Sequence, residues 1–195
     1  MKKKDFIKEI YKDNRSVFNF QEIAMLLNET DASRLRQKIN YYVKTNAIIN
    51  VRRGIYAKEG YSAEELACKI YTPAYLSLEY VLQKVGVIFQ YSEKLTALSY
   101  LSRTIVADKY TISYHKIKNN ILVNPAGIIR QDTGINIAST ERALLDMLYL
   151  NKEYYFDVIT GVDKHKIIEL LPVYRSKKLQ MRVEKILDLQ HVNNF

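Results

Sequence analysis

Residues 31–57 read DASRLRQKINYYVKTNAIINVRRGIYA, and the spacing of the apolar residues changes within this stretch. Up to about residue 46 they recur at helical spacing, which predicts a helix that begins at Thr30 or Asp31. Residues 48–51 and 55–57 instead predict two short β-strands joined by a turn at Gly54. The apolar stripe of the predicted helix consists of Leu35, Ile39, Tyr42 and Val43.

The polar face of this predicted helix carries side chains that suit DNA. Arginine can donate two hydrogen bonds to guanine, and glutamine or asparagine can pair in the same way with adenine. Arg34, Gln37 and Asn40 are therefore the candidates for contacts to base edges. The candidates for contacts to phosphate or the minor groove are Ser33, Arg36, Lys44 and the two arginines of the turn, Arg52 and Arg53.

Two more helices are predicted before it, over residues 5–12 and 20–27, with an extended link at residues 16–18. Three helices and a β-hairpin form the winged helix-turn-helix layout, in which one helix enters the major groove. We predict such a DNA-binding domain over residues 1–60. The alternative is a small helical domain with a solvated charged face. Residues 31–60 hold seven basic and two acidic side chains, and this excess favours DNA.

The net charge of +9 lies at the two ends of the 195-residue chain. Residues 1–60 hold 13 Lys or Arg against 7 Asp or Glu, residues 61–163 hold 10 against 11, and residues 164–185 hold 7 against 2. The basic C-terminal segment either extends the DNA-contact surface or is a solvated helix face, and the sequence leaves both open. Its candidate contacts are Lys164, Lys166, Arg175, Lys177, Lys178 and Arg182.

Residues 61–195 predict a second domain of mixed α/β type, so the whole chain is expected to have an α+β fold. Because the join near residues 58–62 is short, we expect the two domains to pack at a fixed angle. Helices are expected at 61–71, at 78–85 after a cap at Ser77, at 141–150 after a cap at Ser139 or Thr140, and at 165–171 and 178–189. Strands are expected at 95–100, 104–107, 110–115 and 121–124, with a hairpin within 123–137.

The sequence offers little indication of catalysis. It contains no phosphate-binding loop, no zinc-protease motif, no nucleophile elbow and no Cys-x-x-Cys pair. Glu141, Arg142 and Asp146 share one predicted helix, where a surface i,i+4 arrangement or a partner contact explains them as well as acid–base chemistry. Cys68 is expected to pack in the core. We therefore expect no enzymatic activity, no metal and no cofactor.

Targeting signals are also missing from the sequence. The basic first residues are not followed by an apolar segment, and no run of apolar residues is long enough to span a membrane. A single cysteine excludes an internal disulfide. The expected location is therefore the cytoplasm, with no membrane partner.

Four segments together resemble the AbiEi antitoxins, the transcriptional regulators of bacterial type IV toxin–antitoxin systems. VRRGIYAKEGYS (residues 51–62) resembles the family's Arg-Arg-Gly-x-Tyr junction, and YLSLEYVLQKVGVI (75–88) resembles its Ser-x-Glu-x-x-Leu helix. YTISYHKI (110–117) is similar to the strand that follows. IASTERALLDMLYL (137–150) is similar to its Ser-x-Glu-[Lys/Arg]-Ala-Leu-x-Asp helix. The order and spacing of the four segments make the resemblance more specific than any one of them.

This resemblance implies a protein that represses its own operon by binding inverted repeats in the promoter as double-stranded DNA. It also implies that residues 61–195 form an antitoxin domain, which counteracts a cognate nucleotidyltransferase-like toxin in abortive infection, a phage defence. Two alternatives remain open at this point. One is a plain repressor without antitoxin activity, and the other is a module whose helices bind a protein partner.

Overall fold

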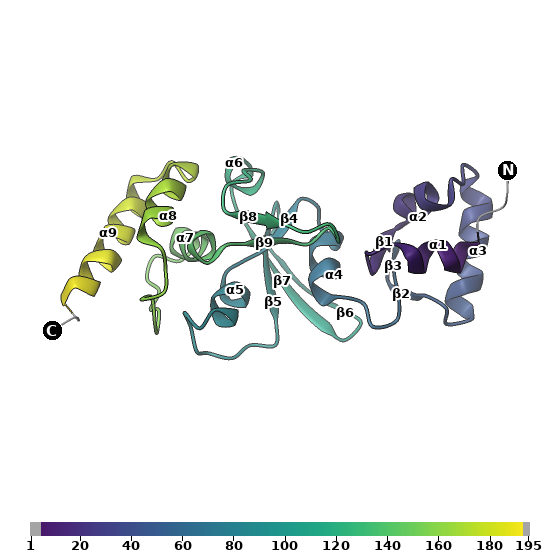
Figure 1. Cartoon of the computed structure of the whole chain (residues 1–195), viewed down its shortest axis with the longest axis horizontal. Helices are drawn as coiled ribbons and strands as arrows, with labels where there is room; N and C mark the ends of the chain where they lie inside the picture. The colour runs from purple at the N-terminus through teal and green to yellow at the C-terminus, as the bar shows by residue number, and fades with distance from the viewer. Residues whose placement is uncertain (1–4, 193–195) are drawn as a thin grey trace.

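The computed structural model describes residues 5–192, and the side chains of residues 5–187. The fold is mixed α+β. Figure 1 shows an elongated molecule, with the N-terminal elements at one end, a sheet in the middle and the C-terminal helices at the other end. We call residues 5–60 the head and residues 61–192 the body.

The head contains three helices and a three-stranded antiparallel sheet. Its elements are α1 (Phe6–Lys12), β1 (Val17–Asn19), α2 (Phe20–Leu27), α3 (Ala32–Lys44), β2 (Ile49–Arg52) and β3 (Ile55–Ala57). The strand order is β1-β3-β2. Residues 16–18 were expected as an extended link, and their extended backbone is confirmed. The pairing of Val17 with Ala57 makes most of the segment part of a strand, which was not predicted. A strand of three residues is too short to show the alternation that identifies a strand in a sequence.

Side-chain caps fix where the head helices begin. The carboxylate of Asp31 accepts hydrogen bonds from the amides of Ser33 and Arg34, which confirms Asp31 as the cap of α3. Asn19 and Glu22 form a capping box at α2. The helices then bury one apolar face each in a common core. This core consists of Phe6, Ile10, Phe18, Ile23, Leu27, Leu35, Ile39 and Ile48.

A six-stranded mixed sheet forms the centre of the body, in the order β6-β7-β5-β4-β9-β8. Its strands are β4 (Ala74–Leu76), β5 (Leu95–Ser99), β6 (Arg103–Ala107), β7 (Tyr110–Lys116), β8 (Ile128–Arg130) and β9 (Asn136–Ala138). The body helices are α4 (Ala63–Ile70), α5 (Glu79–Lys84), α6 (Asn119–Leu122), α7 (Thr140–Leu150), α8 (Lys164–Leu170) and α9 (Lys177–Val192), with a 3-10 turn η1 (Leu171–Val173).

The two faces of this sheet are covered by different parts of the chain. Leu98 and Tyr75 pack among apolar side chains of α5, α6, α7, α8 and α9. The neighbouring Ala97 and Leu76 point to the other face, where they pack with α4 and with residues of the head sheet. The body sheet is therefore covered by helices on one side and by α4 on the other, and the head packs against α4 (Figure 1).

Two local expectations for the body were wrong, and one strand was missed. Residues 121–124 were predicted as a strand, but α6 ends there, because a four-residue apolar run fits a buried helix as well as a strand. The strand β4 was not predicted, since all three of its residues are buried and show no polar alternation. Ser77 does not cap α5. Its hydroxyl donates to Asp146 instead, at 2.8 Å.

Within residues 5–192, no helix combines the length and the apolar composition needed to cross a membrane.

Candidate nucleic-acid interface

The polar face of α3 lies open at the end of the head. Leu35 and Ile39 are buried, whereas every predicted DNA contact on this helix is exposed. The apolar stripe of α3 packs in the head core, so the opposite face, with the base-contact candidates, is exposed to solvent. The exposed side chains are Ser33, Arg34, Arg36, Gln37, Asn40, Tyr41 and Lys44.

Glu29 balances part of the positive charge of this face. Its carboxylate accepts a hydrogen bond from Lys38 Nζ at 2.7 Å and lies 3.7 Å from Arg34 Nε. The bond from Lys38 lowers the pKa of Glu29. The Arg34 side chain is still 52% exposed, so the ion pair with Glu29 leaves more than half of its surface accessible. Arg36 lies over the ring of Phe20, at 5.7 Å, on the flank of the same surface.

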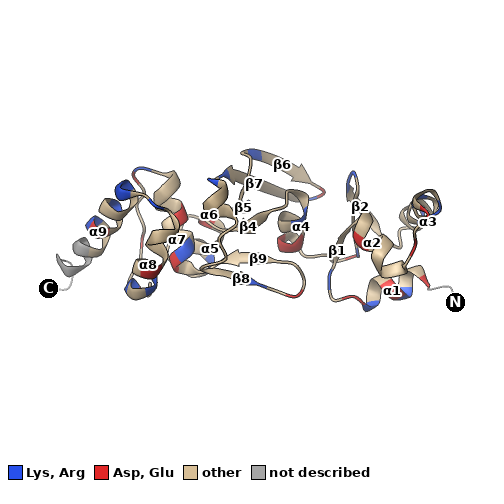
Figure 2. Cartoon of the chain, turned by 90° about the horizontal axis from the view of Figure 1, so that it is seen from above, with Lys and Arg blue, Asp and Glu red and all other residues tan. Residues whose placement is uncertain are grey.

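The turn between β2 and β3 separates the two arginines that the sequence grouped together. Gly54 has φ +78°, and a Cβ at this position would have no neighbour within 4 Å, so the glycine supplies the turn without crowding. Arg53 is exposed. Arg52 instead turns toward the body, where its Nη2 donates to Tyr71 Oη at 3.4 Å and its guanidinium lies 5.7 Å from the Tyr71 ring. Figure 2 shows basic residues both on α3 and at this turn.

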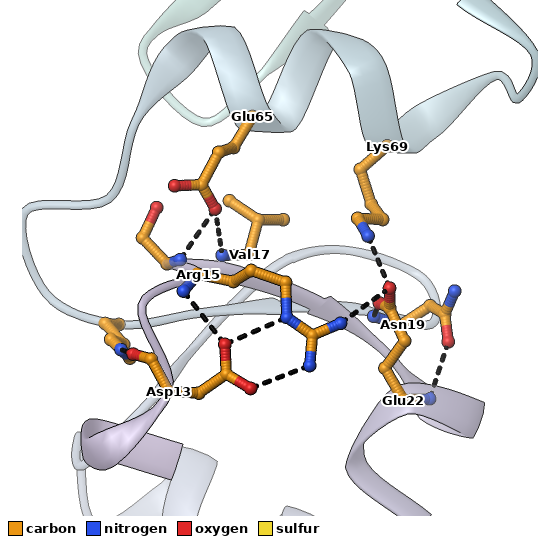
Figure 3. Close-up of polar contacts among 9 residues, drawn as sticks. Asp13, Arg15, Val17, Asn19, Glu22, Glu65 and Lys69 are labelled. Atoms are coloured by element: carbon orange, nitrogen blue, oxygen red, sulfur yellow. Dashed lines mark hydrogen bonds and ion pairs between the residues drawn. The ribbon is translucent and has the colours of Figure 1, made fainter. Parts of the chain in front are cut away.

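Polar contacts connect the head to α4 of the body, and Figure 3 shows them. Glu65 Oε2 accepts hydrogen bonds from the amides of Ser16, at 2.6 Å, and Val17, at 3.0 Å. Lys69 Nζ pairs with Glu22 Oε1 at 2.5 Å. We call this set of contacts the joint. It comprises Asp13, Arg15, Ser16, Val17 and Glu22 of the head and Ser62, Glu65 and Lys69 of the body.

The carboxylates of the joint also hold Arg15. Its Nη1 lies 3.2 Å from Glu22 Oε1 and its Nη2 lies 2.7 Å from Asp13 Oδ2. The hydrogen bonds from Arg15 lower the pKa of Asp13. Glu22 therefore accepts from a head arginine and a body lysine at once, and it also accepts from the amide of Asn19 at 2.8 Å. One carboxylate connects the start of α2 to the body.

The basic C-terminal segment presents fewer free cations than its composition suggests. Arg182 Nη1 donates to the carbonyl of Leu148 at 2.5 Å, so its guanidinium covers the last carbonyls of α7. Lys166 lies 3.8 Å from Asp163. Lys177 and Lys178 in the first turn of α9 are exposed, as is Arg175 before them, and Lys164 is partly buried. The segment lies at the end of the molecule opposite to α3 (Figure 1).

The sequence left a surface position, a partner contact and acid–base chemistry open for Arg142 and Asp146. The structure corrects the surface reading, because both side chains are 0% exposed. Asp146 accepts from the hydroxyls of Tyr174, at 2.6 Å, Ser77, at 2.8 Å, and Tyr75, at 3.2 Å. Arg142 donates to Tyr75 Oη and to the carbonyls of Ile121 and Ala126. We call these side chains, with Arg142 Nε 3.5 Å from Asp146 Oδ1, the core network.

The buried charged side chains of α7 are shaped by their surroundings. Burial raises the pKa of Asp146 to about 6, against the opposing effect of Arg142. Glu141 is buried as well, and its carboxylate accepts from the hydroxyl of Ser139 at 3.0 Å. All three charged residues of α7 therefore serve internal contacts in the described part of the chain.

Cys68 packs in the core, as expected. It lies on α4 against the backbone of Asn136, whose amide donates to Sγ at 3.4 Å. Burial raises the pKa of this thiol to about 11, so it is protonated at neutral pH. Among residues 5–187, no three His, Cys, Asp or Glu side chains gather closely enough to hold a metal ion.

No protein-family model matches the chain, and no curated protein matches its sequence. The resemblance of its four segments to the AbiEi antitoxins therefore stays a prediction from the sequence.

Sequence reasoning missed the contacts between the head and the body, both at the joint and between Arg52 and Tyr71. Glu65, Lys69 and Tyr71 lie in the predicted second domain, and their partners are about 20 to 50 positions away in the sequence. A short-range pattern cannot show such contacts. The one available signal was the length of the join at residues 58–62, which predicted close packing without saying through which residues.

Proposed function

We propose that the chain is a DNA-binding transcriptional regulator whose head is a winged helix-turn-helix domain. In this proposal α3 enters the major groove and the β2–β3 turn contacts the adjacent backbone or minor groove. The observation that carries it is the exposed face of α3, where Arg34, Gln37 and Asn40 lie on one surface and the apolar stripe lies on the other. These are the side-chain types that read guanine and adenine.

Charge supports the same proposal. Arg36 and Lys44 are exposed cations on α3 itself, and Arg53 is an exposed cation on the β2–β3 turn, so both elements offer groups that can hold phosphates. Phosphate contacts set the position of a protein on DNA, and base contacts set its sequence preference. Arg52 is the exception, since it already has a partner in Tyr71. Arg53 is therefore the main cation of the turn for DNA.

The sequence resemblance adds the biological setting of the proposal. The DNA would be inverted repeats in the promoter of the chain's own operon, and the body would counteract a cognate nucleotidyltransferase-like toxin in the bacterial cytoplasm. In the described part of the body, Glu141, Arg142 and Asp146 serve internal contacts. The antitoxin part of the proposal therefore rests on the sequence resemblance alone. Co-expression with the neighbouring reading frame tests it, and growth rescue by the full chain is the expected result.

The DNA-binding part is tested with a fragment of the chain's own promoter. We expect the full chain to bind this fragment in a gel shift at least about tenfold more tightly than a scrambled fragment at the same salt concentration. Equal affinity for both fragments would leave only non-specific binding. No shift at any concentration would favour the alternative in which the head binds a protein partner.

The basic C-terminal segment can be tested in the same assay. Lys177 and Lys178 are exposed, whereas Arg182 is occupied by the carbonyls of α7. A plot of the logarithm of the binding constant against the logarithm of the salt concentration has a negative slope. If these lysines contact phosphate, changing both to alanine makes this log–log slope less steep by about 0.9 for each lost contact. An unchanged slope removes the segment from the interface.

A further inference from the structure

The most unusual contact of the head is made by a residue of the body. Glu65 on α4 is 4% exposed, yet its carboxylate has no cation as a hydrogen-bond partner among the described residues. It accepts the two successive backbone amides of Ser16 and Val17, at 2.6 and 3.0 Å. These amides begin β1, so a body carboxylate satisfies the start of a head strand.

The position of β1 explains why this contact matters for the head. β1 pairs with β3 over three residues, and β3 pairs with β2 to form the hairpin that carries Arg53. The chain of contacts therefore runs from Glu65 through β1 and β3 to the turn. Moving β1 relative to α4 would move the turn with it.

The same body helix also holds the helical side of the head. Lys69, one turn after Glu65, pairs with Glu22 in the first turn of α2. Ser62, which caps α4, donates its amide to Ser16 Oγ at 2.9 Å. Contacts from α4 thus reach both the sheet and the helices of the head, and Figure 3 shows Glu65 and Lys69 pointing to the two sides of the joint.

Apolar packing closes the joint around these polar groups. Val17, Val51 and Ala57 of the head are buried in the same core as Leu66 and Ala67 of α4. One face of the head sheet packs in the head core, and the face that carries Val17, Val51 and Ala57 is completed by the body.

We propose that Glu65 is a positioning residue for DNA binding, which holds the β2–β3 hairpin at the angle where Arg53 and α3 reach DNA together. This inference rests on the proposed function, because it assumes that both elements contact DNA. The part of the chain that determines DNA binding then extends beyond residue 60 and includes α4 of the body.

The test uses full-length variants at one position. Glu65→Gln keeps a carbonyl oxygen that can accept from the two amides, and Glu65→Leu removes the acceptor and leaves both amides without a partner. Glu64→Leu is the matched control, since Glu64 is the preceding residue of α4 and pairs with Lys84 and Tyr80 within the body. Arg53→Ala is combined with each variant.

The decisive readout is the salt dependence of binding to the promoter fragment. If the hairpin moves away, the contact of Arg53 is lost, so Glu65→Leu should flatten the log–log slope by about 0.9, as Arg53→Ala does. Arg53→Ala should then have no further effect in the Glu65→Leu background. Glu65→Gln and Glu64→Leu should keep the wild-type slope.

A variant that only unfolds part of the sample lowers the active fraction and leaves the slope unchanged, so that outcome would overturn the proposal. A second measurement does not need DNA. Dyes at Met25→Cys in the head and Tyr155→Cys in the body, both exposed positions, report the head-to-body distance by energy transfer. The distribution of this distance should be narrow in the wild type and in the other variants, and it should be broader only in Glu65→Leu. Equal distributions would overturn the proposal.

The two proposals fail in different ways. If the wild type does not bind its promoter fragment, or if Arg53→Ala leaves the slope unchanged, the proposed function or its hairpin contact fails. If Arg53→Ala flattens the slope and Glu65→Leu does not, the positioning role of Glu65 fails while the DNA-binding proposal stands.

Discussion

The joint and the core network are two clusters of charged side chains that differ in their surroundings. At the joint, Arg15 and Glu22 keep 25% and 15% of their side-chain surface exposed. In the core network, Arg142 and Asp146 keep none. Partly hydrated ions can lose one partner and recover part of the energy from water, whereas a buried ion cannot. The joint therefore suits a contact between two parts of the chain, and the core network suits a fixed scaffold.

The largest effect should follow from breaking the core network. Asp146→Ala leaves Arg142 buried without its counter-charge and removes the acceptor of three hydroxyl groups. We expect the free energy of unfolding to fall by about 3–5 kcal/mol, measured by urea denaturation. A loss below about 1 kcal/mol would mean that water reaches Arg142, which would contradict its burial.

The equivalent change at the joint should cost much less. Lys69→Met removes one partner of Glu22, which keeps Arg15 and the amide of Asn19. We expect a loss of about 1 kcal/mol in the same denaturation assay. A loss as large as that of Asp146→Ala would show that the joint is as dependent on complete pairing as the core, and the contrast between the two clusters would disappear.

The two clusters should also respond to pH with opposite signs. The pKa of Asp146 is raised to about 6 by burial, so the folded state binds its proton more tightly than the unfolded state does. Its contribution to stability is therefore fullest below about pH 4, the unfolded value, and declines as the pH rises toward 6. Asp13 has a lowered pKa because of Arg15, so its contribution is lost as the pH falls below about 4.

Unfolding free energies measured from about pH 3 to pH 7 can separate these effects. Relative to Asp146→Asn, the wild type should lose stability between about pH 4 and pH 6. Relative to Asp13→Asn, it should lose stability only toward the acidic end of the range. Parallel curves for the wild type and Asp146→Asn would mean that Asp146 does not change its pKa on folding.

The smallest expected effect is on the face of α3. Glu29→Gln removes the carboxylate shared by Lys38 and Arg34 without exposing an apolar surface. We expect little change in the free energy of unfolding, since these ion pairs lie near the surface. Affinity for any DNA should rise modestly in a gel shift, because one negative charge leaves the interface. Weaker binding would indicate that Glu29 orients Arg34.

Sequence patterns predicted those parts of the molecule that depend on local spacing. The helices of the head, the cap at Asp31 and the turn at Gly54 follow from neighbouring residues, and so does the exposed face of α3. Arg142 and Asp146 were considered as a surface pair because side chains at i and i+4 are neighbours on a helix surface. Only the long-range contacts of Tyr75 and Tyr174 show that this pair is internal.

The same reason limits the prediction for the candidate interface. Arg52 and Arg53 are adjacent and chemically identical, so local patterns assign both of them one role. The contact of Arg52 with Tyr71, across the joint, assigns them different ones. A position in the sequence shows which side chains are available, and the packing of the body on the head decides which of them are free.

The central claim is that the exposed face of α3 reads DNA, and Arg34→Ala tests it most directly. We would measure binding of the wild type and this variant to the promoter fragment and to single-base variants of it, by fluorescence anisotropy at fixed salt. We expect a loss of about 1–3 kcal/mol in binding free energy and a relaxed preference at one base position. Normal affinity with unchanged preference would contradict the claim and remove α3 from the major groove.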